Sequence, residues 1–197
     1  MDWDHLFEDL EDQLAADWES ERAVLDAETA RLRIATLPLR ERIRVLCGAG
    51  ETAALDLGGV RLGARLHTLG ADWLSAFVIG ERRLSIIPLS ALTGIALDHG
   101  ALLRSLDDGS DGTTLRERMT FGFVLRDLAR RRVPIRLFPR DGDDLHGTAD
   151  RAGADHLDLA VHDPGTPRRA SSISEFRIVP FAALRRVRVE PIDAELL

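Results

Sequence analysis

The sequence predicts an α+β protein in which an N-terminal α-helical arm precedes two tandem small β-barrels, each made of one helix and five strands. Two observations support this fold class. The apolar pattern changes from helical spacing to strand alternation near residue 51, and two short motifs recur later in the same order. We expect an acidic arm at 1–37, the first copy at 38–98, a linker at 99–113 and the second copy at 114–191.

The arm is predicted from residues 2–35, which contain no Gly or Pro. Its large apolar residues recur at steps of three and four: Trp3, Phe7, Leu10, Leu14 and Trp18. This spacing is typical of one face of an amphipathic helix. Residues 1–30 carry eleven acidic residues and one Arg, so the opposite side is acidic and solvated. We expect the apolar face to contact the barrels, a second arm or a protein partner. The predicted interface residues are Trp3, Phe7, Leu10 and Trp18.

The first copy begins with a short helix over 39–47, because Pro38 suits a first helical turn and Gly48 favours a helix end. From Glu51 onward, apolar residues alternate between small-residue turns, which is typical of short strands. The predicted strands cover 53–57, 60–69, 72–79, 84–87 and 95–97, with a one-turn helix before the last. Five short strands bury their inner face best by closing into a small barrel.

The second copy is predicted from two repeated motifs. The sequence Gly-Ala-Asp-x-Leu occurs at 70–74 and again at 153–157. The segment 86–92, an apolar run interrupted by Pro, has its counterpart at 178–184. The nine-residue difference between these two offsets falls in the polar stretch 163–172, where we expect a longer hairpin loop. The matched order predicts a duplicated unit.

The second copy also has the element order of a known family. A helix predicted over 114–131 is followed by an apolar strand at 133–137, a turn at Asp141-Gly142, a strand containing Gly147 and a third strand at 156–161. This order resembles the Sm-like (Lsm/Hfq-type) family, and the first copy shows it more weakly. The resemblance implies SH3-like barrels that self-associate into homo-oligomers through their edge strands and bind RNA.

Both copies depart from that family at the positions that contact a base. Asp158 and Ser75 stand where the family usually has Asn. Pro180 and Pro88 begin the dipeptides that stand where it has a basic residue and a glycine. An acidic side chain repels phosphate and Pro has no cationic group. The resemblance therefore predicts the barrel without the family's uridine pocket.

An Arg-rich segment is the best indication of a ligand. Residues 115–140 contain eight Arg and two acidic residues. On the last strand, Val187 and Val189 are expected to face inward, which directs Arg186 and Arg188 outward. Helix ends favour cations for local reasons, so capping and solvation are the alternative to phosphate binding. The predicted nucleic-acid-binding residues are Arg126, Arg130, Arg131, Arg132, Arg136, Arg140, Arg186 and Arg188.

Two aromatic residues of the first copy indicate a further interface. Trp73 and Phe77 alternate with Leu74, Ala76 and Val78, so they are expected to point away from their own barrel's core. Exposed aromatic residues on a strand usually meet another surface. We expect Trp73 and Phe77 to pack against the arm or the other barrel, with an external partner as the alternative.

The sequence contains no recognisable catalytic arrangement, so we expect no enzyme activity, no cofactor and no metal site. Its only cysteine is Cys47, and its His residues lack the spacing of metal ligands. The acidic N-terminus and the absence of a long apolar segment predict a cytoplasmic protein without a membrane span. The leading hypothesis is a self-associating RNA-binding protein. The alternatives are a protein–protein adaptor or scaffold that uses the barrels and arm, and a DNA-associated transcriptional regulator.

Overall fold

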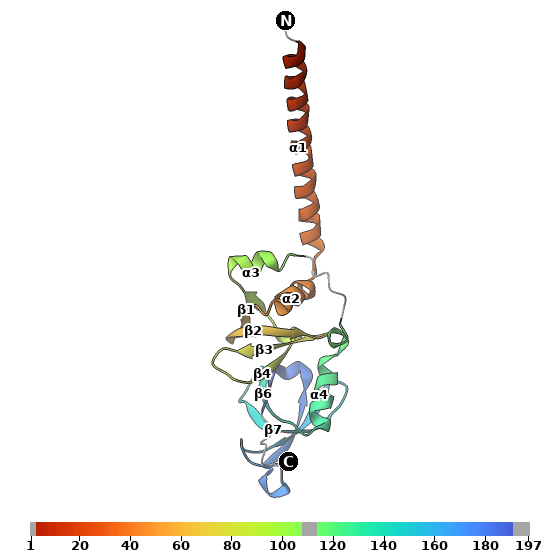
Figure 1. Ribbon diagram of the computed structural model, residues 1–197. Coiled ribbons are helices and arrows are strands. Elements are labelled where there is room, and N and C mark those ends of the chain that lie inside the picture. The colour runs from red at the N-terminus through yellow and green to blue at the C-terminus, as the bar shows by residue number, and fades with distance from the viewer. Residues whose placement is uncertain (1–2, 108–113, 191–197) are drawn as a thin grey trace. The chain divides into compact units, whose positions relative to one another are not determined.

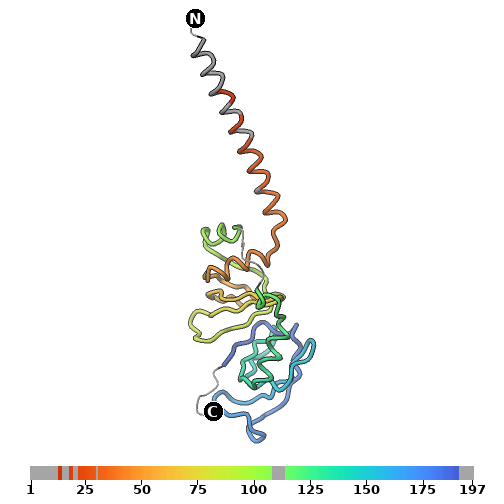
Figure 2. The backbone as a smooth tube through the Cα atoms, turned by 45° about the vertical axis from the view of Figure 1, so that its right-hand side comes forward, coloured from red at the N-terminus to blue at the C-terminus, as the bar shows by residue number. Residues whose placement is uncertain are grey.

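The computed structural model describes residues 3–107 and 114–190, except for the side chains of residues 3–12, 15–17, 20, 21 and 30. The chain divides into two compact units, Met1–Arg42 and Ile43–Leu197. The first contains the helix α1 (Trp3–Thr36), as the Gly-free and Pro-free sequence predicted (Figures 1 and 2). No helix in the described ranges is both long and apolar enough to cross a membrane.

Helix α2 (Leu39–Gly48) follows Pro38, and its predicted position is confirmed. Its buried residues Ile43, Leu46 and Cys47 lie three and four positions apart, as expected for one helical face. After the helix, Gly50 adopts a positive φ of 62°, which an L side chain rarely tolerates. This turn directs the chain into the first strand.

Within the described ranges, ten antiparallel strands follow, five in each half of the chain. The first half contains β1 (Thr52–Asp56), β2 (Arg61–Leu69), β3 (Trp73–Val78), β4 (Leu84–Pro88) and β5 (Gly94–Ala96). The second half contains β6 (Pro134–Pro139), β7 (Leu145–Ala152), β8 (His156–Val161), β9 (Glu175–Pro180) and β10 (Leu184–Val189). The one-turn helices η1 (Leu89–Ala91) and η4 (Phe181–Ala183) precede β5 and β10.

The predicted pair of closed five-stranded barrels is wrong. All ten strands form one sheet in the order β5-β1-β2-β3-β4-β10-β6-β7-β8-β9, and this sheet does not close. The first five strands are not a separate barrel, because the outer edge of β4 pairs with β10. Strand alternation shows which side chains share a face, but it does not show which edges pair.

The two halves nevertheless repeat one arrangement of elements. Within the sheet, β5-β1-β2-β3-β4 is followed by β10-β6-β7-β8-β9, which is the same order with each number raised by five. Helix α4 (Phe121–Arg130) precedes the second set as α2 precedes the first, and both helices have ten residues. The correspondence extends to single positions, since Ile43 and Leu125 are both fully buried.

Residues 99–107 and 114–118 are more structured than a linker. Helix α3 (His99–Arg104) begins there because the Asp98 side chain accepts a hydrogen bond from Ala101 N at 2.9 Å. The one-turn helix η2 comes next (Arg116–Arg118), and another, η3 (Ala170–Ser172), lies in the long hairpin loop of the second half. Helix α4 starts later than predicted, because Thr120 is its N-cap. The rest of the predicted linker, residues 108–113, lies outside the described residues.

Two hydrophobic clusters form the core. The first joins α2 to the inner faces of β1–β4, and the second joins α4 to β6–β10. Trp73 and Ile86 belong to the second cluster although β3 and β4 come from the first half. They lie on the opposite face of these strands from Leu74 and Ile87, which are in the first cluster. Strands β3 and β4 therefore contribute to both cores.

Candidate interaction surfaces

The joint between the two halves is an antiparallel pair of strands, β4 and β10. Val187 lies opposite Ile86, and Arg188 lies opposite Ser85. Val187 and Ile86 are both buried and join the second hydrophobic cluster. Strand β10 is thus paired on both sides, with β4 and with β6.

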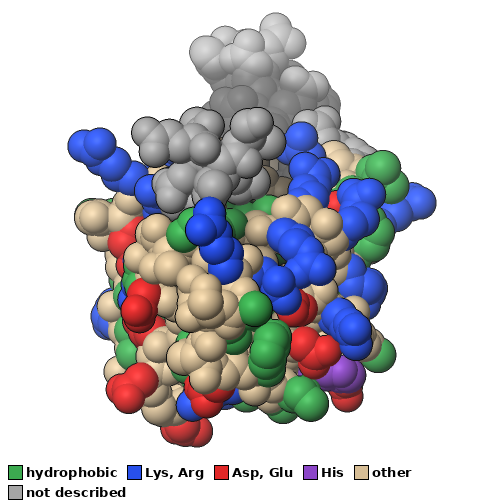
Figure 3. Space-filling view, turned by 90° about the horizontal axis from the view of Figure 1, so that it is seen from below, with side chains coloured by type: hydrophobic (Ala, Val, Ile, Leu, Met, Phe, Trp, Pro, Cys, Tyr) green, Lys and Arg blue, Asp and Glu red, His purple; other side chains and the backbone are tan. Residues whose placement is uncertain are grey.

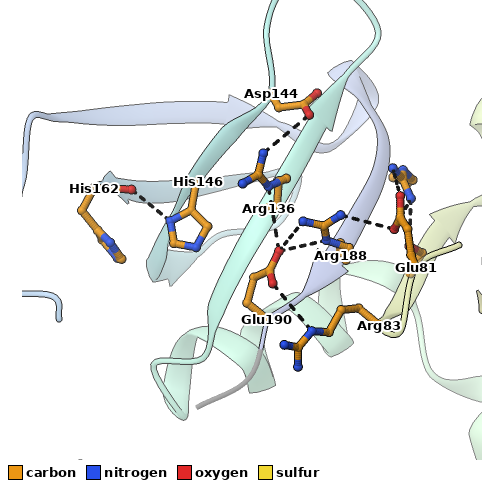
Figure 4. A network of polar contacts seen from close by, with 10 residues as sticks. Glu81, Arg83, Arg136, Asp144, His146, His162, Arg188 and Glu190 are labelled. Atoms are coloured by element: carbon orange, nitrogen blue, oxygen red, sulfur yellow. Dashed lines mark hydrogen bonds and ion pairs between the residues drawn. The ribbon is translucent and has the colours of Figure 1, made fainter. Parts of the chain in front are cut away.

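An ion-pair network covers the other face of this joint (Figure 4). Arg186 donates to both carboxylate oxygens of Glu81, at 2.8 and 2.9 Å, and its guanidinium lies 3.7 Å from the centre of the Phe138 ring. Arg188 contacts Glu81 at 3.4 Å and Glu190 at 2.8 Å. Burial opposes the ionisation of Glu81, but the hydrogen bonds and charges of Arg186 and Arg188 lower its pKa below the ordinary value.

The expectation that Arg186 points outward into solvent is wrong. Its side chain lies on the face opposite Val187, as alternation requires, but only 6% of the residue is exposed. Glu81 comes from a turn 105 residues earlier and cannot be matched to Arg186 from the sequence pattern. The guanidinium groups of Arg186 and Arg188 are therefore engaged within the joint.

The other two strand arginines are also held by the protein. Arg136 lies 3.9 Å from both Asp144 and Glu190, so it extends the network in Figure 4. Arg140 is exposed and donates to Ser90 O at 2.7 Å. That bond ties the start of the β6–β7 turn to η1 of the first half.

The four other predicted arginines lie on α4 or directly after it. Arg130 and Arg131 both pair with Asp127, at 2.5 and 2.8 Å, and Arg132 pairs with Asp150 at 2.9 Å. Arg126 donates to Gly153 O at 3.0 Å. All four remain exposed despite these contacts. The structure thus brings Arg130, Arg131 and Arg132 together at the C-terminal end of α4, apart from the buried joint, and places the guanidinium of Arg126 at the first turn of the helix.

A view from below the molecule shows how charged side chains are distributed on that face. Arginine side chains are numerous on one side of that face, with carboxylates between them and hydrophobic side chains exposed nearby (Figure 3). Asp150 also pairs with Arg168, and the hydrogen bond from Arg168 is the main reason that the pKa of Asp150 is lowered. The carboxylates thus stay ionised and offset part of the positive charge.

Trp73 points away from the first cluster, as predicted, and packs into the second. Its indole N donates to Met119 O at 2.8 Å, just before α4. In the preceding turn, the Asp72 carboxylate accepts a hydrogen bond of 2.6 Å from Phe121 N, the first residue of α4. The Gly70-Ala71-Asp72 turn therefore holds the N-terminus of α4 against the first half.

Phe77 is half-buried and stays on the outer face of β3. Its ring lies 5.5 Å from His67 and 5.5 Å from the guanidinium of Arg65, both on β2. A pocket of about 520 Å³ opens between this outer face and α4. Apolar residues such as Trp73 and Phe123 line it together with Arg131.

The last strand of the sheet, β9, leaves a hydrophobic edge unpaired among the described strands. Phe176 is 65% exposed and Ile178 is 74% exposed. They line a second pocket, of about 430 Å³, together with Asp158 and Arg177. Sequence reasoning did not select these two residues. The repeat offset of 92 does identify them, because it matches Phe176 to Leu84 and Ile178 to Ile86.

The turn before β8 is exposed at the same end of the sheet. Asp155 is the counterpart of Asp72, but its side chain is 89% exposed and contacts the adjacent His156 at 2.9 Å. The hydrogen bond and charge of His156 lower the pKa of Asp155, so it remains a carboxylate at neutral pH. In the first half, Asp72 at this position caps helix α4. In the second half, Asp155 at the equivalent position faces solvent.

Two histidines beside the β7–β8 pair and one cysteine on α2 are of residue types that take part in catalysis. His162 is buried and hydrogen-bonds Thr148 Oγ1 at 2.9 Å, while His146 Nδ1 contacts His162 O at 2.9 Å. These contacts satisfy the polar atoms of the β7–β8 pair. Burial, with a smaller contribution from Glu117, raises the pKa of Cys47 to about 12, so its sulfur is a thiol and a poor nucleophile. In residues 3–107 and 114–190, no three His, Cys, Asp or Glu side chains are grouped as metal ligands would be.

The predicted interface on the arm is described only in part. Trp3, Phe7 and Leu10 have backbone positions in α1, and their side chains lie outside the described residues. Trp18 is 74% exposed.

Comparison with protein-family models, curated proteins and solved structures finds no match to the chain. The resemblance to the Sm-like family therefore stays a prediction, and its expected fold of two barrels is corrected by the single sheet.

Proposed function

We propose that this chain is a non-catalytic assembly protein of the cytoplasm that binds other polypeptides by adding strands at the open edge of β9. One observation carries the proposal. The edge of β4 is covered by β10, whereas the equivalent edge of β9 is free of any described strand and presents Phe176 and Ile178 to solvent.

The backbone of β9 is arranged for strand addition. Phe181 N donates to Asp155 O, so the alternation of an antiparallel ladder directs the odd-numbered residues of β9 toward β8. The N–H and C=O groups of Phe176 and Ile178 then face the open side. An exposed strand edge with large apolar side chains is a template for another chain.

A mutation of the apolar pair tests this proposal. We expect Phe176→Asp with Ile178→Asp to abolish capture of protein partners by the immobilised full chain from a nuclease-treated extract of the producing cells, because charges replace the apolar contact. Leu115→Asp with Phe123→Asp, two exposed apolar sites away from β9, is the control. Unchanged capture by a correctly folded β9 variant, judged by circular dichroism, contradicts the proposal.

A second function, RNA binding, is favoured by the exposure of the four arginines on α4 and directly after it. We propose it as an activity of this surface alone, since Arg186 and Arg188 are engaged in the joint. Contacts from a few guanidinium groups to phosphates give binding that weakens steeply with salt.

We expect a variant in which four arginines are replaced by Gln to retain RNA at least about tenfold less in low-salt filter binding, because several phosphate contacts disappear. The four substitutions are Arg126→Gln, Arg130→Gln, Arg131→Gln and Arg132→Gln. Arg61→Gln with Arg82→Gln, at exposed sites of the first half, is the control. Equal retention by the four-site variant argues against this surface. Competition between single-stranded RNA and duplex DNA separates the RNA-binding role from a DNA-associated one.

A further inference from the structure

We infer that the partner of the β9 edge is a second copy of this chain, which docks its α2 and β5 there in the way that α4 and β10 dock on the first half. The inference rests on the proposed function and adds the identity of the partner. The joint inside the chain is the template, because both its strand pair and its helix cap have counterparts at the ends of the sheet, where β5 and β9 each have one edge without a described partner strand.

The strands provide the first counterpart. Inside the chain, Val187 of β10 lies opposite Ile86 of β4. The two halves are related by an offset of 92 residues in this region. The equivalent of Val187 in the first half is therefore Ile95 on β5, and the equivalent of Ile86 in the second half is Ile178 on β9. Strands β5 and β9 are the two ends of the ten-stranded order. A second copy that repeats the internal joint therefore places its Ile95 opposite Ile178.

The neighbouring pair is complementary in size. Inside the chain, the large Arg188 lies opposite the small Ser85. The equivalent pair between copies is Ala96 opposite Arg177, so the large and small side chains exchange strands. The ion pair of Arg186 has no equivalent, because Gly94 occupies its position. The joint between copies is thus sterically matched and weaker than the joint inside the chain.

The helices provide the second counterpart. Asp72 caps α4 through Phe121 N, and α4 lines a pocket together with the outer face of β3 and β4 near Trp73. The offset of 82 between the two helices matches Phe121 to Leu39, the first residue of α2. Asp155, the counterpart of Asp72, is exposed at the β9 end. We therefore place α2 of the second copy with its N-terminus at Asp155.

The joint between copies is heterologous, because one copy offers β9 and the other offers β5. Each added copy again leaves one free end of each kind. Such an interface forms a closed ring if the rotation between copies closes, and an open filament if it does not.

Disulfide trapping in the full chain tests the register. In a Cys47→Ala background, Ile95→Cys with Ile178→Cys is expected to form a ladder of disulfide-linked copies on mild oxidation, because directly opposed strand residues have suitable Cα separations. Ile95→Cys with Phe176→Cys, two residues out of register, is the matched control and is expected to give no ladder. Ile86→Cys with Val187→Cys is expected to give a disulfide within one chain.

Sedimentation of the unmodified chain over a range of concentrations provides a second readout. We expect its mass to rise with concentration, and Asp155→Ala to weaken self-association about fivefold through the lost helix cap. Asp143→Ala is the control, since Asp143 is an exposed residue in the β6–β7 turn. Ile178→Pro, which an edge strand tolerates, removes one open N–H group and is expected to prevent association.

The outcomes separate this inference from the proposed function. Self-association without the Ile95–Ile178 ladder overturns the inferred docking and leaves strand addition at β9 in place. A chain that remains monomeric but captures a different protein through β9 also overturns the inferred docking and leaves strand addition at β9 in place. If no protein is captured through β9, both the inference and the proposed function are wrong.

Discussion

The environment of Arg186 in the structure differs from the one that its sequence context predicts. In the sequence it belongs to a set of arginines on a strand beside a basic helix, which favours an exposed position. In the structure it is buried against Phe138 and forms two hydrogen bonds with Glu81. A buried charge is stable only when paired, so Glu81 is required by the position of Arg186.

Replacing that partner tests the importance of the pair. We expect Glu81→Gln to lower the free energy of unfolding by about 3 kcal/mol, because it leaves Arg186 buried without a counter-charge. Asp56→Asn, which removes an exposed contact with Arg61 at 3.7 Å, is expected to lower it by less than about 1 kcal/mol. Urea unfolding of the three proteins measures both effects, and equal losses would contradict the assigned role of Glu81.

The ion pair of Glu81 also makes the free energy of unfolding depend on pH, and the Glu81→Gln variant tests this dependence. The folded pKa of Glu81 is lowered relative to its ordinary value of 4.5. A group whose pKa is lowered by folding stabilises the protein above the unfolded pKa, and this stabilisation is lost as the pH falls through the folded pKa. The stability difference between the original chain and Glu81→Gln should therefore be full at pH 7 and narrow below about pH 4. A difference independent of pH argues against the ion pair.

The strands and turns were more predictable than their pairing. The first helix, the short second helix and the alternation of β1 to β4 follow from local patterns. Helix α3 was missed because Asp98-His99-Gly100 is typical of a turn, while its stability comes from the Asp98 cap and the buried Ala101. Local composition does not show whether a polar residue caps a helix or ends a strand.

One glycine shows what the pairing of two strands requires. A Cβ added at Gly147 on β7 would lie 2.2 Å from the carbonyl oxygen of Ala160 on β8. We expect Gly147→Ala to lower the free energy of unfolding by roughly 1–3 kcal/mol, because backbone must move to make room. Gly48→Ala, where a Cβ meets nothing within 4 Å, is expected to cause no loss. Thermal or urea unfolding measures the contrast, and similar stability of the two variants contradicts this contact.

At the scale of the whole molecule, the pairing of the two halves determines which strands lie at the ends of the sheet. A duplicated sequence suggested two separate barrels, but β4 and β10 join them into one sheet with a shared second cluster. A joint of this kind leaves two dissimilar ends, β5 and β9, in every copy of the chain. The proposed assembly follows from these ends, and therefore the candidate site lies at an edge that sequence reasoning had not selected.

Residue order and spacing were sufficient for the acidic helix, the repeated helix-and-strand elements and the faces on which Trp73 and Val187 lie, because these depend on neighbours within a few positions. Four of the predicted arginines are exposed on α4 or directly after it. The pairing of β4 with β10, the burial of Arg186 and the exposure of Phe176 and Ile178 were decided only by the tertiary structure. These features depend on contacts between residues about a hundred positions apart, and side-chain periodicity contains no information about which distant edge a strand will meet.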